Sequence, residues 1–186
     1  MQEKVQKMSL KKLYYAVMND EVTETFGEVE TLSMPIELTL TPNFAEATFD
    51  AGDQVVASDV QLDSITIAGQ TADLPTQVQA DWYGHEVSPS GGLVTNVNDV
   101  APYVAIGFES GSKLVWLYKT RLRATEETNT TKRKGEIAYK QSGFSGETIP
   151  LKDGLLKYTV RTDDESVTTT PDLFFGTVTL PNTTEI

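Results

Sequence analysis

The side chains that most often carry out chemistry in proteins are scarce in this sequence. His85 is the only histidine, and there is no cysteine. A zinc site built on imidazole needs more than one histidine, and thiolate nucleophiles, thiolate metal ligands and disulfides all need cysteine. A Ser-His-Asp relay would have to use the single ring of His85, which we expect at the surface after a helix. The sequence therefore argues against an enzyme, and no catalytic residue is assigned.

Acidic side chains are plentiful, but their spacing does not match a known metal site. Asp50 and Asp53 lie three residues apart, and Asp163, Asp164 and Glu165 follow one another. A calcium loop of the EF-hand type needs oxygen ligands at alternate positions and a central glycine, and neither group has this pattern. The spacing of glycine and lysine that binds phosphate groups is also missing. We therefore expect solvated acids, with no metal and no cofactor.

The charges are separated along the chain, whose net charge is -12 and whose isoelectric point is about 4.4. No lysine or arginine occurs between Leu13 and Ser112, where 16 acids fall, whereas Lys113 to Lys140 holds eight cations against three acids. A chain this acidic is not expected to bind nucleic acid without sequence preference, because that binding rests on cations. The separation is typical either of a solvated surface or of acidic and basic faces that meet between identical copies.

The length and composition favour one mainly β domain over residues 1–186. The β-branched residues Thr, Val and Ile make up 49 of the 186 residues, and they pack well on pleated sheets. No apolar run approaches the roughly 18 residues of a membrane-spanning helix. The apolar patch 13–18 after the basic start is shorter than the roughly 7 to 15 residues of a secretion signal. We expect a chain inside the cell without a membrane anchor.

One segment has the strict alternation of a strand with a single buried face. Its apolar face is made by Ile36, Leu38 and Leu40. Its polar face is made by Glu37, Thr39 and Thr41. Side chains alternate between the two faces of a strand, so the pattern predicts one face in the core and one in water.

A second segment, from residue 59 to residue 67, alternates in two phases. Val60 and Leu62 are apolar first, and Ile65 and Ile67 then continue one position out of phase. Such a change of phase is typical of a β-bulge, which we predict near Asp63 and Ser64. The polar side chains Gln61 and Asp63 are expected to extend the polar face of the preceding strand.

The connection between these two strands, from Pro42 to Ser58, is longer than a typical hairpin loop of 2 to 5 residues. It contains apolar side chains that a solvated loop does not need, namely Phe44, Phe49, Val55 and Val56. Two interpretations remain open at this point. The loop folds back on its own core, or it is an arm that buries these side chains in another subunit.

The remaining pattern predicts one helix and several strands. The helix spans Asp73–Gly84, with proline near its start, glycine at its end and an apolar stripe of Leu74, Val78 and Trp82. The segment 114–118 is apolar on both faces and is predicted as a central strand covered on both sides. Other strands are expected at 93–98, 103–108, 119–124, 136–140, 155–162 and 173–180. The polar segment 126–135 is expected as an exposed tip.

Four segments together resemble the major tail protein family of long-tailed phages of Gram-positive bacteria. They are LKKLYYA at 10–16, ADLPTQVQA at 72–80, NDVAPYVAIGFES at 98–110 and VWLYK at 115–119. The resemblance covers roughly residues 9–162. Residues 1–7 precede it, and the stretch from 163 on matches only loosely.

The resemblance implies a fold and a structural function. Proteins of this family are β-sandwiches or partly open barrels with one flanking helix and a long inter-strand loop. They form stacked rings of six subunits around a channel, the tail tube of the virion, which is assembled in the host cytoplasm and through which DNA passes without specific binding. A tape measure protein and a tail terminator protein are the implied partners. The chain ends are then expected as arms, an N-terminal one at 1–15 and a C-terminal one at about 163–186.

The resemblance also implies roles for particular residues. The channel would be lined by Glu37, Thr39, Thr41, Gln61 and Asp63, which is an acidic and threonine-rich wall that lets DNA slide. Contacts between subunits or rings are expected from Phe44, Phe49, Asp50, Asp53, Val55, Lys132, Arg133, Lys134, Leu13 and Tyr14. With this resemblance, the separated charges favour acidic and basic faces that meet between copies.

A second class of function stays open beside this one. A β-sandwich module that binds carbohydrate or a surface would need an exposed aromatic platform, for which Trp82, Tyr83 and Trp116 are the candidates. Two of these residues lie in segments that we predict as core.

Overall fold

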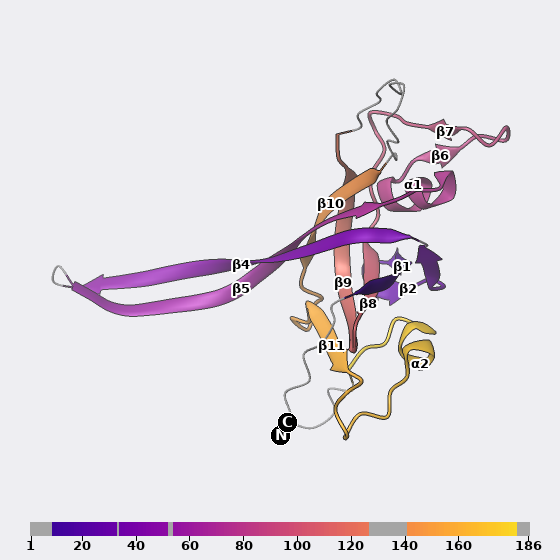
Figure 1. Cartoon of the computed structure of the whole chain (residues 1–186). Coiled ribbons are helices and arrows are strands. Elements are labelled where there is room, and N and C mark those ends of the chain that lie inside the picture. The colour runs from indigo at the N-terminus through magenta and orange to yellow at the C-terminus, as the bar shows by residue number, and fades with distance from the viewer. Residues whose placement is uncertain (1–8, 33, 52–53, 127–140, 182–186) are drawn as a thin grey trace, which may run out of the picture.

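The computed structural model describes residues 9–32, 34–51, 54–126 and 141–181, and it confirms a mainly β chain (Figure 1). Within these residues, nine strands form one antiparallel sheet, and β6 and β7 pair separately. The strands are β1 Leu10–Asp20, β2 Thr25–Phe26, β3 Glu30–Leu32, β4 Pro35–Ala51, β5 Gln54–Thr71, β6 Glu86–Val87, β7 Leu93–Val94, β8 Val104–Ser110, β9 Lys113–Ala124, β10 Ser142–Ile149 and β11 Lys157–Arg161. The helices are α1 Thr76–Tyr83 and α2 Pro171–Phe175. No helix of the described residues has the length and apolar character needed to cross a membrane.

The sheet runs in the order β2-β1-β8-β9-β10-β5-β4, with β3 also paired to β1 and β11 to β9. Strand β9 lies in its centre, as the sequence predicts. Leu114, Trp116 and Tyr118 face one side, Val115 and Leu117 face the other, and all five are buried. A strand that is apolar on both faces is stable only where both faces are covered, so β9 requires a cover on each side of the sheet.

Helix α1 covers the first side. Its start and end follow the predicted signals, since Pro75 caps it and Gly84 ends it in the left-handed conformation with φ 72°. A Cβ on Gly84 would lie 2.2 Å from the carbonyl oxygen of Val100, so glycine is required here. The predicted stripe of Leu74, Val78 and Trp82 is buried, and it packs in one cluster with side chains of β1, β8, β9 and β5.

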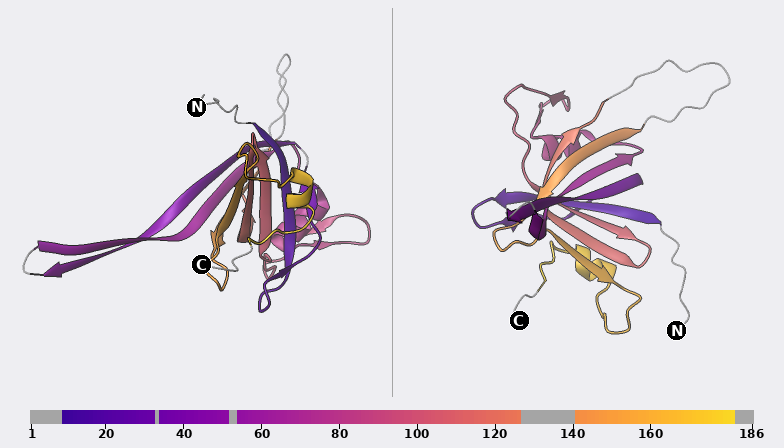
Figure 2. Two further views of the ribbon diagram at one scale, coloured as in Figure 1. Left: turned by 90° about the horizontal axis from the view of Figure 1, so that it is seen from below. Right: turned by 90° about the vertical axis from the view of Figure 1, so that its left-hand side faces the viewer.

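The segment from residue 163 to residue 181 covers the second side (Figure 2). Phe174 and Phe175 of α2 are 1% and 5% exposed, and the ring of Phe175 stacks on that of Tyr14 with centroids 4.0 Å apart. The Trp116 Nε1–H donates to the Phe174 carbonyl at 3.0 Å, and the Tyr118 hydroxyl donates to the Thr179 carbonyl at 2.7 Å. This segment is therefore part of the core.

Two sequence predictions about the chain ends are wrong for the described residues. Residues 10–15 belong to strand β1 in the sheet and are not an arm, and the predicted strand 173–180 is replaced by helix α2 and the turn after it. The sequence carried signals for both. Residues 13–18 form the continuous apolar run of a fully buried strand. Thr170 followed by Pro171 is a helix start, and the Thr170 hydroxyl accepts from the Leu173 N–H at 3.4 Å.

The predicted loop 42–58 is also wrong, because its described residues extend the two neighbouring strands. β4 and β5 pair from Pro35 with Thr71 out to Ala51 with Gln54. Only residues 65–71 of β5 also pair with β10, so the outer part is a two-stranded ribbon that projects from the sheet (Figure 1). We call residues 44–51 and 54–62 the ribbon. Pro42 fits this arrangement because β4 is an edge strand, where a missing N–H leaves no neighbour unpaired.

Candidate assembly surfaces

The polar side chains predicted on β4 share one exposed face of the sheet. Leu38 and Leu40 pack against the core, as predicted, although the predicted core residue Ile36 is 46% exposed. Glu37, Thr39 and Thr41 alternate with them and are exposed. Their cross-strand partners are Gln70, Ala68 and Thr66 of β5. The alternation of this strand is therefore confirmed, apart from its first apolar residue.

The predicted bulge is confirmed at Asp63. Asn43 pairs with Ser64 and Phe44 pairs with Leu62, so Asp63 has no residue opposite. Gln61 pairs with Ala45 of β4. Ala45 lies two residues after Asn43 on that strand, so Ala45, Asn43 and Gln61 share one face. The bulge thus lets Ile65 point into the core while Gln61 stays on the polar face.

Hydrogen bonds connect three strands on this polar face. The Asn43 side-chain amide donates to Ser64 Oγ at 3.0 Å and to Thr66 Oγ1 at 2.9 Å. The Ser64 hydroxyl donates to Glu147 Oε1 of β10 at 2.6 Å. The carboxylate of Glu147 is therefore held in place on the face that bears Thr41 and Thr66, its neighbours in the register.

The polar face also carries cations, which the sequence prediction of an acidic and threonine-rich wall left out. In the register of β9 and β10, Arg121 lies opposite Glu147 and Arg123 lies opposite Ser145. The Arg123 Nε–H donates to Ser145 Oγ at 3.3 Å. The face formed by β9, β10, β5 and β4 is therefore of mixed charge. The arginines follow Leu114–Tyr118 on the same strand, so their strand was predictable, but their place on the same face as Thr39 and Thr41, two strands away, was not.

The ribbon carries a second surface, which is apolar. Phe44, Val60 and Leu62 are 57%, 61% and 39% exposed. Phe44 lies directly opposite Leu62, and Val60 is next on the same face, opposite Glu46. The ribbon therefore presents apolar side chains to water on a segment that has no second layer.

The other residues predicted as contacts between subunits lie in three places: in the outer ribbon, outside the described residues, and in the core. Phe49, Asp50 and Val55 belong to the outer ribbon, where Asp50 pairs with Val55. Asp53 and the basic triplet 132–134 lie outside the described residues. Leu13 and Tyr14 are 1% and 9% exposed within the chain itself, so their prediction as contacts between subunits is wrong: the sheet already buries them.

His85 is less exposed than the sequence suggested. Its side chain is 16% exposed, and its Nδ1 lies 2.7 Å from Asp99 Oδ2. The backbone N–H of Asn96 donates to the same oxygen at 2.8 Å and, together with His85, lowers the pKa of Asp99 below its ordinary value. The pair joins the two ends of the segment 85–99, so its evident role is to hold that segment closed. Within the described residues, no group of three or more His, Cys, Asp or Glu side chains could hold a metal ion.

The aromatic side chains that a carbohydrate-binding platform would use are buried. Trp82 and Trp116 have no exposed surface, and Tyr83 is 7% exposed, with burial raising its pKa to about 12. All three lie in the two core clusters. They are therefore not available to stack on a sugar, and the alternative function loses the residues that suggested it.

A scan against protein families finds none that matches this chain, and a search of curated proteins finds no match either.

Proposed function

We propose that the chain is a structural subunit that assembles with identical copies into a phage tail tube. The tube consists of stacked rings of six subunits, belongs to the virion, and is built in the host cytoplasm. The observation that carries the proposal is the ribbon, which projects from the sheet and exposes Phe44, Val60 and Leu62 side by side on one face. The resemblance of residues 9–162 to major tail proteins supplies the kind of assembly.

The edges of the sheet support ring formation. In the described residues β4 pairs only with β5, so one side of β4 has unpaired N–H and C=O groups. Such an edge is a template for another strand. At the opposite end of the sheet, β2 and β3 are only two and three residues long. In the proposed ring, the sheet of each subunit continues into the next one, and the fold is then a β-sandwich or partly open barrel completed by its neighbours.

The polar face would line the channel. Glu37, Thr39, Thr41 and Gln61 lie on it, and Asp63 is exposed beside them at the bulge. Carboxylates repel phosphate and threonine hydroxyls carry no charge, so the described residues of this face that would attract DNA electrostatically are Arg121 and Arg123, and DNA would pass without specific binding. The tape measure protein and the tail terminator protein remain the partners that the resemblance implies.

The ribbon would contact the next ring. A two-stranded hairpin alone is at best marginally stable in water, so burial of Phe44, Val60 and Leu62 in a neighbouring subunit would stabilise it. Because the ribbon and the surface that receives it are different parts of the chain, this contact is of the head-to-tail kind that generates long assemblies.

The test is negative-stain electron microscopy of the full chain at high concentration. We expect hollow tubes from the unmodified chain and none, or only short ones, from Phe44→Ser. Val97→Ser is the matched control, since Val97 is fully exposed but lies outside the ribbon. If the unmodified chain stays monomeric at all concentrations, the proposal is wrong.

A second experiment tests the basic segment. Lys132, Arg133 and Lys134 are replaced together by glutamate, which reverses the charge of the predicted tip. If acidic and basic faces meet between copies, this variant forms few tubes. High salt screens the new repulsion but does not restore the lost attraction, so it recovers only part of the tube formation. Tubes of normal length and number would show that the triplet has no part in assembly.

A further inference from the structure

Arg121 lies on the polar face, and its charged group lies over Tyr103. The register places Arg121 in one row with Glu147 of β10, Thr66 of β5 and Thr41 of β4. The guanidinium group instead lies over the ring of Tyr103, 4.0 Å from the ring centroid. A guanidinium over an aromatic face is attracted by the electron density of the ring. The guanidinium group therefore lies toward Tyr103, which precedes β8, and away from β10 on the other edge of β9.

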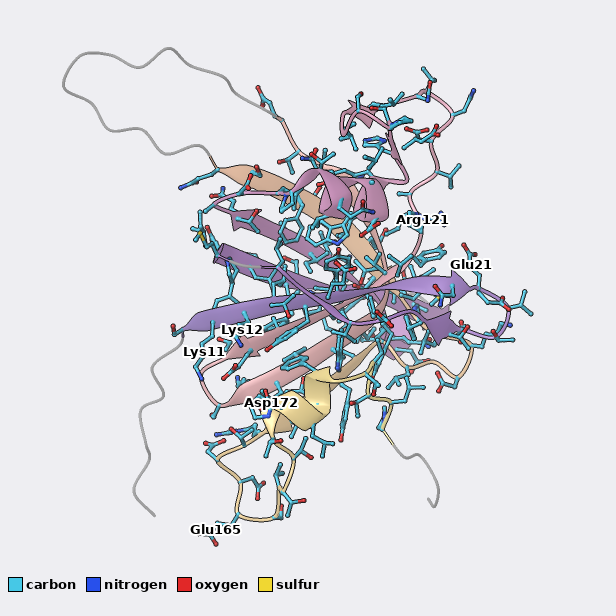
Figure 3. All side chains as sticks on the ribbon, turned by 90° about the vertical axis from the view of Figure 1, so that its right-hand side faces the viewer. Lys11, Lys12, Glu21, Arg121, Glu165 and Asp172 are labelled. Carbon is cyan, nitrogen blue, oxygen red and sulfur yellow. The ribbon has the colours of Figure 1, made fainter. Side chains whose placement is uncertain are left out.

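An acidic residue of the turn between β1 and β2 meets this cation. Arg121 Nη2 lies 3.7 Å from Glu21 Oε1, and Figure 3 shows the two side chains next to each other. The side chains of Glu21 and Arg121 are 60% and 43% exposed, so Glu21 neutralises the guanidinium as a solvent-exposed ion pair. Arg121 therefore contacts two groups, the ring of Tyr103 and the carboxylate of Glu21.

A second cation is covered by the same turn. Lys119 Nζ lies 3.2 Å from Glu24 Oε1, and both side chains are less than 15% exposed. Lys119 also lies 5.2 Å from the centroid of the Tyr103 ring. The two carboxylates of the turn thus meet the first two cations that follow the apolar part of β9.

The turn itself is held in a defined conformation. The Asp20 carboxylate accepts from the backbone N–H groups of Val22 at 2.7 Å and Thr23 at 3.3 Å, and these bonds lower its pKa below the ordinary value. Glu24 adopts a positive φ of 52°, which is unusual for a residue other than glycine. Its carboxylate also accepts from the backbone N–H of Lys152. These bonds hold the backbone of the turn and the carboxylate of Glu24 in place, and the same turn carries Glu21 next to Arg121.

We propose that the turn of residues 20–24 is a charge shield, in which Glu21 and Glu24 keep Arg121 and Lys119 from binding the phosphates of DNA. The inference rests on the proposed function, in which this face lines the channel. It lessens the positive charge of the face, because the carboxylate of Glu147 remains on the face while the cation opposite to it is paired with Glu21, which leaves Arg123 as the cation of this face without an acidic partner in the turn. DNA then meets fewer accessible cations than the sequence of β9 contains.

The experiment compares the binding of a short fluorescent DNA duplex to the full chain at low and at physiological salt. Glu21→Gln is the main variant, because this exposed residue can be changed without loss of folding. We expect its affinity for the duplex to rise about fivefold at low salt, the size set by one exposed ion pair. The dependence on salt should also become steeper, because another cation contacts phosphate.

Two further variants isolate the cause. Glu165→Gln removes the same charge from an exposed position far from Arg121 in Figure 3, and it should leave the affinity within about twofold of the unmodified chain. The double variant Glu21→Gln with Arg121→Gln should return to the unmodified affinity. Equal affinities for Glu21→Gln and Glu165→Gln, or a double variant that still binds more tightly, would overturn the shield.

Electron microscopy of the same preparations separates this inference from the function on which it rests. Tubes in all samples together with a selective effect of Glu21→Gln support both. Tubes in all samples without that effect overturn the shield alone. If no sample forms tubes, the proposed function fails, and with it the shield in a channel, whatever the duplex affinities are.

Discussion

Two segments leave the central sheet, and the apolar side chains of one are exposed while those of the other are buried. The ribbon of β4 and β5 extends away from the body, with Phe44 and Val60 more than half exposed. The segment 163–181 turns back, and Phe174 and Phe175 are almost fully buried. Both segments combine aromatic or β-branched residues with threonines and acids. Their composition therefore does not explain the difference.

The difference follows from what lies within reach of each segment. The segment 163–181 follows β11, which pairs with the central strand β9, and that strand presents Trp116 and Tyr118 on the face opposite to α1, within reach of the segment. The ribbon starts at the edge strand and passes beyond the last residue paired to β10, so none of the described strands outside the ribbon pairs with it. An apolar segment is buried where a complementary surface is available, and the ribbon has to find that surface in another molecule.

Removal of a buried ring from the folded-back segment should have the largest effect. Phe174→Ala deletes a side chain of the core cluster that also contains Trp116 and Tyr118, and we expect the free energy of unfolding to fall by about 3 to 5 kcal/mol. Urea denaturation followed by tryptophan fluorescence measures the change. Leu173→Ala is the matched control. Leu173 is the residue before Phe174 and is 70% exposed, so its replacement should lower the free energy of unfolding by less than about 0.5 kcal/mol. Similar losses for both variants would mean that α2 does not pack as described.

A smaller effect is expected from one hydrogen bond of the same segment. Tyr118→Phe keeps the buried ring but removes the donor to the Thr179 carbonyl, so the free energy of unfolding should fall by about 1 kcal/mol. Tyr158→Phe is the comparison, because its ring packs on Phe174 from the partly buried rim of the same cluster. The result to check is a larger loss for Tyr118→Phe than for Tyr158→Phe in the same denaturation experiment.

The ribbon should respond in the opposite way. Val60→Ser replaces an apolar side chain that is exposed in the isolated subunit, and we expect the free energy of unfolding of dilute protein to change by less than about 0.5 kcal/mol. Polymerisation measured by light scattering at high concentration should nevertheless decrease. A variant that unfolds easily while still monomeric would show that the ribbon already packs on its own chain.

The smallest expected effect is the pH dependence of stability that comes from Asp163, at the start of the segment 163–181. The Arg161 guanidinium donates to Asp163 at 3.2 and 2.9 Å and lowers the pKa of Asp163 to about 2. A carboxyl with a lowered pKa in the folded state stabilises the protein above its ordinary pKa, near 4, and this contribution is lost as the pH falls toward 2. We therefore expect Asp163→Asn to be slightly less stable than the unmodified chain at pH 7, with the difference shrinking between pH 4 and pH 2. A difference that is independent of pH would contradict the ion pair as its source.

Features that depend on neighbouring residues were predictable from the sequence. The end of α1 at Gly84, its stripe of Leu74, Val78 and Trp82, and the bulge at Asp63 all follow from local spacing. The buried strand β9 was recognised because both of its faces are apolar. Leu13 and Tyr14 were misplaced because a resemblance to an assembled family suggested contacts, whereas the sheet of the single chain already buries them.

The candidate site was predictable only in part. Glu37, Thr39 and Thr41 share an exposed face because side chains of a strand alternate, which holds in any fold. That Arg121 and Arg123 lie on the same face depends on β10 pairing with both β9 and β5, and these pairings join residues far apart in the sequence. The direction of the Arg121 side chain depends in addition on Tyr103 and on the turn that carries Glu21.

The sequence by itself determined the mainly β character, the period of each apolar stripe and the residues that share a face, because these properties depend on residue type and on spacing along the backbone. Only the tertiary structure decided which apolar face is covered by the same chain and which cation is covered by an acid. Burial and ion pairing depend on what lies across the sheet or beyond its edge, and those neighbours come from distant parts of the chain.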